Sequence, residues 1–92
     1  MQVVYVQIKC ELGKAYKVAE VIIEDIHETM EIYSTSGPYD LLAKFQLSDD
    51  QSIGEFVNEK LHKVGGIRDT LTIMTFKLFG GRDHMRLDES KV

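Results

Sequence analysis

The sequence has very little of several residue types, and each shortage narrows what the protein can be. Its 92 residues include one cysteine, one proline and no tryptophan. The single thiol, Cys10, cannot form an internal disulfide, and no cysteine and histidine cluster surrounds it that could hold structural zinc, so we expect a reducing, cytoplasmic setting. No run of about 18 apolar residues occurs, and no basic segment precedes an apolar stretch at the start, so we expect neither membrane spanning nor secretion.

Basic residues are also too few and too scattered to suggest a nucleic-acid-binding protein. The chain has 11 lysines and arginines against 15 aspartates and glutamates, which leaves a net charge of -4. No basic cluster offers the phosphate-neutralising surface on which nucleic-acid affinity depends, so we expect no direct binding to DNA or RNA. With 43% hydrophobic and 28% charged residues, the composition is that of one soluble globular domain.

The spacing of apolar residues predicts four strands and two helices. The strands, with apolar and polar residues alternating, cover residues 3–10, 29–35, 39–47 and 67–79. Helical spacing relates Ala15, Val18, Ala19, Ile22, Ile23 and Ile26, and again Ile53, Phe56, Val57, Leu61 and Val64. Ser48 and Gln51 fit a capping box before the second helix, and Gly65 with Gly66 is expected to end it.

The resulting order, β-α-β-β-α-β, is the ferredoxin-like plan of an α+β protein. Both helices should lie on one face of a four-stranded antiparallel sheet, because right-handed crossovers place them on the same side. We expect residues 1–79 to form this domain. The polar tail, 80–92, begins with two glycines and is expected to be mobile or to lie as a strap on a neighbouring subunit.

The helices leave the other face of the predicted sheet uncovered. We expect this face to carry Val3, Tyr5, Leu42, Lys44, Thr70, Thr72, Met74, Phe76 and Leu78. Such an apolar surface is unusual for a protein that stays a monomer, because large exposed apolar patches mark interaction sites. The sequence therefore predicts self-association through the sheet.

No catalytic or metal-binding constellation stands out. His27, His62 and His84 are far apart in the sequence, and none lies at ligand spacing from another metal-binding residue, so a three-histidine site assembled by the fold is the weaker alternative. Cys10 falls among the core positions of the first strand, where a thiol is inert. The paired glycines lack the spacing and the lysine of a phosphate loop. We expect no metal, no cofactor and no enzymatic reaction.

Two short segments are more unusual. Gly37-Pro38-Tyr39-Asp40 opens the third strand, with a glycine that permits a tight turn and a proline that sets φ. The Asp40 carboxylate, expected on the side away from the helices, suits the ammonium group of a ligand, but aspartate also caps turn backbones, and both interpretations stay open. Thr70 and Thr72 follow Gly66 and are expected to face the uncovered side, although threonine is also an ordinary strand residue.

Three segments together resemble the C-terminal effector domain of the Lrp/AsnC feast/famine regulators: G-P-Y-D at 37–40, F-V-N-E-K-L at 56–61 and G-G-I-R-D-T-L-T at 65–72. The resemblance covers residues 3–79. It implies a module, often called RAM, that pairs sheets face to face as a dimeric α+β barrel, assembles its dimers into rings and binds amino acids between dimers. Family regulators carry an N-terminal helix-turn-helix domain, whereas here the first strand begins at Val3, so we expect a stand-alone effector module.

The leading hypothesis is an amino-acid-binding effector and oligomerisation module that performs no reaction. The expected ligand contacts are Gly37, Tyr39, Asp40, Gly66, Thr70 and Thr72. Asp40 would accept the ammonium of the amino acid, backbone N–H groups near the two glycines would hold its carboxylate, and a threonine hydroxyl would add a donor.

The expected partners are a free amino acid, further copies of the chain and full-length Lrp/AsnC-type regulators. Two alternatives stay open. One is a ligand-free assembly partner of such regulators, and the other is a small enzyme of the dimeric α+β barrel type. The enzyme is disfavoured because isoleucine, valine and phenylalanine fill the helix stripes, which favours close packing over a roomy cavity.

Overall fold

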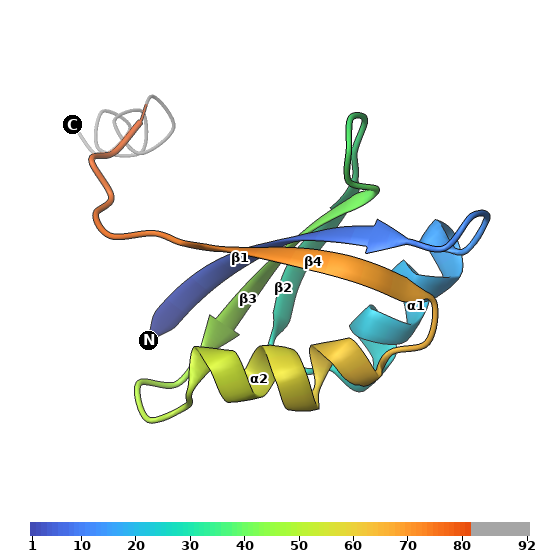
Figure 1. Cartoon of the computed structure of the whole chain (residues 1–92). Helices are drawn as coiled ribbons and strands as arrows, with labels where there is room; N and C mark the ends of the chain where they lie inside the picture. Colours follow the sequence, from blue (N-terminus) through green and yellow to red (C-terminus); the bar gives the residue numbers. More distant parts are fainter. Residues whose placement is uncertain (82–92) are drawn as a thin grey trace.

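The computed structural model describes residues 1–81, and its elements follow the predicted order (Figure 1). They are β1 (Gln2–Cys10), α1 (Ala15–Asp25), β2 (Thr29–Ser34), β3 (Leu41–Leu47), α2 (Ile53–Glu59), the 3-10 helix η1 (Leu61–Lys63) and β4 (Ile67–Met74). The strands form one antiparallel sheet in the order β2-β3-β1-β4. Both α-helices lie on one side of this sheet (Figure 1). The predicted ferredoxin-like α+β fold is confirmed.

The core lies between the helices and the sheet, because the two central strands alternate strictly. The buried residues of β1 and β3 are Val4, Val6, Ile8, Cys10, Leu41, Ala43, Phe45 and Leu47. The helix layer covers them with Val18, Ile22, Ile26, Phe56, Val57 and Leu61. Phe45 meets Phe56 edge to face, with ring centroids 4.9 Å apart, which is a geometry that aromatic quadrupoles favour.

The second helix has different ends from those predicted. Its N-cap is Ser52, whose hydroxyl accepts a hydrogen bond from the Glu55 N–H at 3.3 Å. The predicted cap, Ser48 with Gln51, forms the preceding turn instead, in which Gln51 Oε1 accepts from the Ser48 N–H at 2.8 Å. α2 ends at Glu59, and the chain continues as η1. The predicted single helix is therefore two short ones.

The face predicted for the last strand is wrong. β4 pairs with β1 so that Thr72 lies opposite Val6, Thr70 lies opposite Ile8, and Met74 also faces a core residue of β1. Directly paired residues of an antiparallel sheet share a face. Both threonines and Met74 therefore lie on the helix side of the sheet.

A β-bulge causes this reversal. The register shifts between Lys9 and Cys10, and Cys10 pairs with Ile67. Ile67 still packs against the core, but the extra residue of a bulge turns every later side chain to the opposite face. Leu71 and Ile73 consequently lie on the uncovered side, where they are 46% and 40% exposed.

β4 is also shorter than predicted. It ends at Met74, and Phe76 and Leu78 lie beyond it, 95% and 72% exposed. These two residues therefore do not belong to a strand. The prediction for the tail, 80–92, concerns residues that lie almost entirely outside the described part of the chain.

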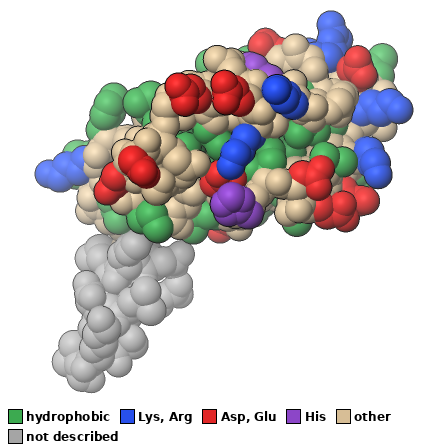
Figure 2. Space-filling view, turned by 90° about the horizontal axis from the view of Figure 1, so that it is seen from below, with side chains coloured by type: hydrophobic (Ala, Val, Ile, Leu, Met, Phe, Trp, Pro, Cys, Tyr) green, Lys and Arg blue, Asp and Glu red, His purple; other side chains and the backbone are tan. Residues whose placement is uncertain are grey.

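The two sides of the sheet differ in character. We call the uncovered side the open face. By register its apolar and aromatic residues are Val3, Tyr5, Tyr33, Leu42, Leu71 and Ile73, and its polar residues include Gln7, Glu31, Lys44, Gln46 and Asp69. Figure 2 shows the molecule from the side on which the helices lie in Figure 1, where acidic and basic side chains are interspersed. The open face therefore combines apolar and aromatic side chains with polar ones, and β4 contributes other residues to it than predicted.

Candidate functional site

Four of the predicted ligand contacts lie at the same end of the sheet, in two separate segments: Gly37, Tyr39 and Asp40 in the β2–β3 turn, and Gly66 just before β4. β1 ends there, beside the start of β3 on one side and the start of β4 on the other. The β2–β3 turn and the glycine before β4 therefore flank the end of β1. The sheet order, in which β1 lies between β3 and β4, is what places these segments on either side of the end of β1.

Asp40 continues the hydrogen-bond ladder between β3 and β1. Its N–H donates to the Ile8 carbonyl at 2.9 Å, and its Oδ2 accepts from the Cys10 N–H at 2.7 Å. The carboxylate therefore caps a backbone amide of the neighbouring strand rather than one of its own turn. Burial and, to a lesser extent, the charge of Asp40 raise the pKa of the Cys10 thiol, which keeps this thiol protonated and unreactive.

The turn itself is held by short hydrogen bonds and by a lysine. Thr35 donates from its N–H to the Asp40 carbonyl at 2.9 Å and from its hydroxyl to the Tyr39 carbonyl at 3.1 Å. Gly37 has a φ of 104°, a conformation that favours glycine. Lys9 reaches the turn from β1 and donates from Nζ to the Pro38 carbonyl at 3.2 Å. The sequence reasoning missed Lys9, although it alternates with the core residues of β1.

Gly66 serves the packing of α1. Its φ is 95°, and a Cβ atom there would lie 2.9 Å from Val18 Cγ2 and 3.4 Å from Lys14 Cβ. Its carbonyl accepts from the Glu11 N–H at 2.8 Å. Only glycine combines this backbone conformation with so close an approach to the helix.

Thr70 and Thr72 are separated from the turn by the sheet. Thr70 Oγ1 lies 2.7 Å from His62 Nε2 on the helix side. The two residues border a cavity of about 130 Å³, together with Ile67 and Arg68. No signal in the sequence identifies His62 as the partner of Thr70, because the contact depends on how η1 meets β4.

Other kinds of site receive no support from the described residues. Within residues 1–81, no three histidine, cysteine, aspartate or glutamate side chains come close enough to hold a metal ion. None of the helices in this part of the chain is both long and apolar enough to span a bilayer.

Comparison with known sequences identifies the family of this fold. A family model described as the Lrp/AsnC ligand binding domain matches residues 3–80. The HTH-type transcriptional regulator Ptr1 from Methanocaldococcus jannaschii is 36% identical over 69 residues, and the match covers 70% of this chain and 47% of the regulator. The chain spans about half the length of the curated regulators it matches.

Solved structures show the same fold. The crystal structure of FFRP-DM1 is similar with a TM-score of 0.75 and 26% identity, and the match covers 83% of this chain and 100% of that chain. The transcriptional regulator NMB0573 from Neisseria meningitidis, solved as a complex with L-Met, has a TM-score of 0.76 at 14% identity, over 97% of this chain and 58% of that one. At that identity the likeness concerns the fold alone. Since the family model spans nearly all of the described residues, the chain belongs to the Lrp/AsnC ligand-binding domain family.

Proposed function

We propose that this chain is an amino-acid-binding effector module that self-associates and acts on full-length Lrp/AsnC-type regulators. Its relation to transcription regulators rests on the family model and on the similarity to Ptr1. FFRP-DM1, whose whole chain is matched by this domain, supports a role for the domain apart from a DNA-binding one. The ligand site would lie at the end of the sheet where β1 stops.

The observation that carries the proposal is the pair of opposite charges at the β2–β3 turn. Asp40 uses one carboxylate oxygen to cap Cys10, and within residues 1–81 its other oxygen makes no hydrogen bond. Lys9 holds its ammonium against the Pro38 carbonyl of the same turn. An α-amino acid carries an ammonium and a carboxylate a few ångströms apart, so Asp40 and Lys9 provide a complementary partner for each.

The remaining predicted contacts take secondary parts in this proposal. Gly37 and Gly66 would let ligand atoms approach the backbone closely, and Tyr39 would contribute to the wall of the site. Thr70 and Thr72 would contribute hydroxyls only from the helix side, since the sheet separates them from the turn.

Titration calorimetry with the proteinogenic amino acids tests this function. Methionine is the first ligand to try, because the regulator from Neisseria meningitidis that shares this fold was solved with L-Met. Saturable binding of at least one amino acid is the expected result. Absence of binding by every member of the set, to a protein shown to be folded, would contradict the proposal.

The open face is the proposed surface of self-association. Tyr33, Leu71 and Ile73 are 54%, 46% and 40% exposed there. Val3, Tyr5 and Lys44 border a cavity of about 440 Å³ on this face. A second copy that placed its own open face on the first would remove these side chains from water, which is the usual reason for such a patch.

One observation favours a second candidate, the ligand-free assembly partner. Asp40 already performs a structural task by capping the Cys10 amide, and this task alone would explain its presence in the turn. The two candidates share the self-association and differ in ligand binding. The same calorimetric titration therefore distinguishes them.

A further inference from the structure

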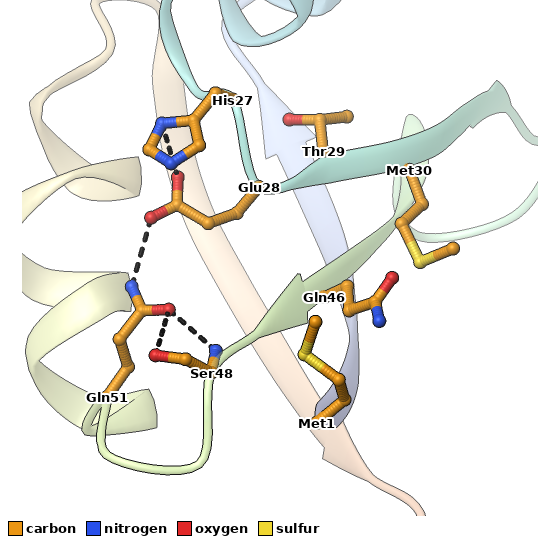
Figure 3. Close-up of a pocket in the computed structure, with 8 residues that line it drawn as sticks. All are labelled: Met1, His27, Glu28, Thr29, Met30, Gln46, Ser48 and Gln51. Carbon is orange, nitrogen blue, oxygen red and sulfur yellow. Dashed lines mark hydrogen bonds and ion pairs between the residues drawn. The ribbon is translucent and has the colours of Figure 1, made fainter.

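A buried carboxylate lines a second pocket, at the opposite end of the sheet from the β2–β3 turn. Figure 3 shows this pocket, in which Glu28 lies just before β2, and Gln46, Ser48 and Gln51 come from the end of β3 and the turn that follows. The pocket has a volume of about 300 Å³. No residue of the proposed amino-acid site lines it.

Only one of the two carboxylate oxygens of Glu28 is satisfied. Glu28 is 6% exposed, and its Oε2 accepts from Gln51 Nε2 at 3.0 Å and pairs with the Lys60 ammonium. Its Oε1 is buried and has no hydrogen-bond partner among the described residues. Buried acceptors in native proteins are rarely left unpaired, because desolvation is not compensated. Oε1 can therefore accept a hydrogen bond from a donor outside the chain, either water or a ligand group.

The group that covers this oxygen is easily displaced. His27 Nδ1 lies 3.5 Å from Oε1, and the His27 side chain is 87% exposed. Figure 3 shows the imidazole ring beside the carboxylate. An exposed ring held by one long contact can rotate away at little cost, which would open Oε1 to the pocket.

We propose that this pocket binds a small organic cation with a primary ammonium group. The ammonium would replace the His27 ring and donate one hydrogen bond to Glu28 Oε1, and its other two donors would remain free for water in the pocket. An ammonium suits the site better than a neutral donor, because hydrogen bonds to a carboxylate are stronger when the donor is charged. Lys60 is already engaged with the other oxygen.

Titration of the full chain with putrescine tests the inference. Putrescine is a diamine without a carboxylate, so it lacks the anion that the proposed amino-acid site would bind. Saturable binding is expected for the wild type, and Glu28→Gln should weaken it about 10- to 100-fold, as the loss of a charge-assisted hydrogen bond implies. Glu59→Gln is the matched control, because it removes the same charge from an exposed position of α2. Asp40→Asn tests whether putrescine binds at the β2–β3 turn instead of this pocket. Both control variants should bind putrescine like the wild type.

Three results would overturn the inference: no saturable binding by the wild type, equal weakening by Glu28→Gln and Glu59→Gln, or loss of binding in Asp40→Asn alone. His27→Ala provides a test that does not depend on the folding of Glu28→Gln, since it keeps the buried ion pair and alters only an exposed ring. It should tighten putrescine binding, because the ring no longer competes for Oε1. Unchanged or weaker binding in a folded His27→Ala protein would likewise contradict the inference.

Discussion

Asparagine and alanine at position 40 separate the two roles of Asp40, because they remove different parts of the carboxylate. Asparagine keeps an oxygen that can accept from the Cys10 N–H, a hydrogen bond of 2.7 Å in the native protein, but it has no charge. Alanine removes the acceptor as well and leaves that N–H without its partner. We therefore expect Asp40→Asn to impair ligand binding alone, and Asp40→Ala to impair both binding and folding.

The structure sets the size of both effects. A hydrogen bond to a charged acceptor contributes about 1.5–3 kcal/mol when buried. Asp40 is only half-buried, so we expect Asp40→Ala to lower the free energy of unfolding by about 1–2 kcal/mol, or the Tm by roughly 4–16 °C. Loss of one partner of a buried charge pair costs about 2–5 kcal/mol, so both variants should bind the amino acid about 30-fold more weakly or worse.

Thermal unfolding followed by circular dichroism and calorimetric titration measure the two quantities on the same samples. Asp25→Asn, at an exposed position of α1, controls for the change in net charge and should resemble the wild type in both. If Asp40→Asn binds the ligand as tightly as the wild type, Asp40 does not belong to the ligand site. If Asp40→Ala melts like the wild type, the argument for its capping role is wrong.

Three other outcomes are expected. Gly66→Ala should lower the free energy of unfolding, measured by urea denaturation, by about 2–4 kcal/mol, because the alanine would have a left-handed φ and its Cβ would clash with α1. Gly65→Ala is the control and should have little effect, because a Cβ at that position has open space around it. Burial acts to raise the pKa of Glu28, but hydrogen bonds from lysine and glutamine side chains lower this pKa below its usual value. The unfolded state therefore binds more protons than the folded state, so the free energy of unfolding should fall as the pH drops below about 4.3 and through the folded-state pKa. Glu28→Gln should make the free energy of unfolding less dependent on pH in this acidic range. Ile73→Lys on the open face should reduce the mass in light scattering to that of the 10.5 kDa monomer, while Ile23→Lys, exposed on α1, should leave the assembly intact.

Lys9 and Glu28 show where sequence reasoning about the sites fell short. Lys9 is one of several polar residues that alternate along β1, and only its contact with Pro38, 29 positions away in the sequence, relates it to the turn. Glu28 follows an aspartate, an isoleucine and a histidine, and nothing in this polar stretch predicts a buried carboxylate. Its burial results from the packing of α2 and the turn after β3 against the start of β2. In each case the informative neighbour is distant in the sequence.

The sequence by itself determined the order of the elements, the antiparallel plan, the buried faces of β1 and β3, and the presence of apolar residues on the open face. These properties depend on periodicity within a strand or a helix, where each residue's neighbours are a few positions away. Only the tertiary structure decided which side of the sheet Thr70 and Thr72 occupy and which amide Asp40 caps. A single extra residue at the bulge beside Cys10 reverses the face of every later residue in β4, and the register between strands that meet only after folding places the Asp40 carboxylate on the Cys10 N–H. Both follow from long-range pairing, which leaves no local pattern in the chain.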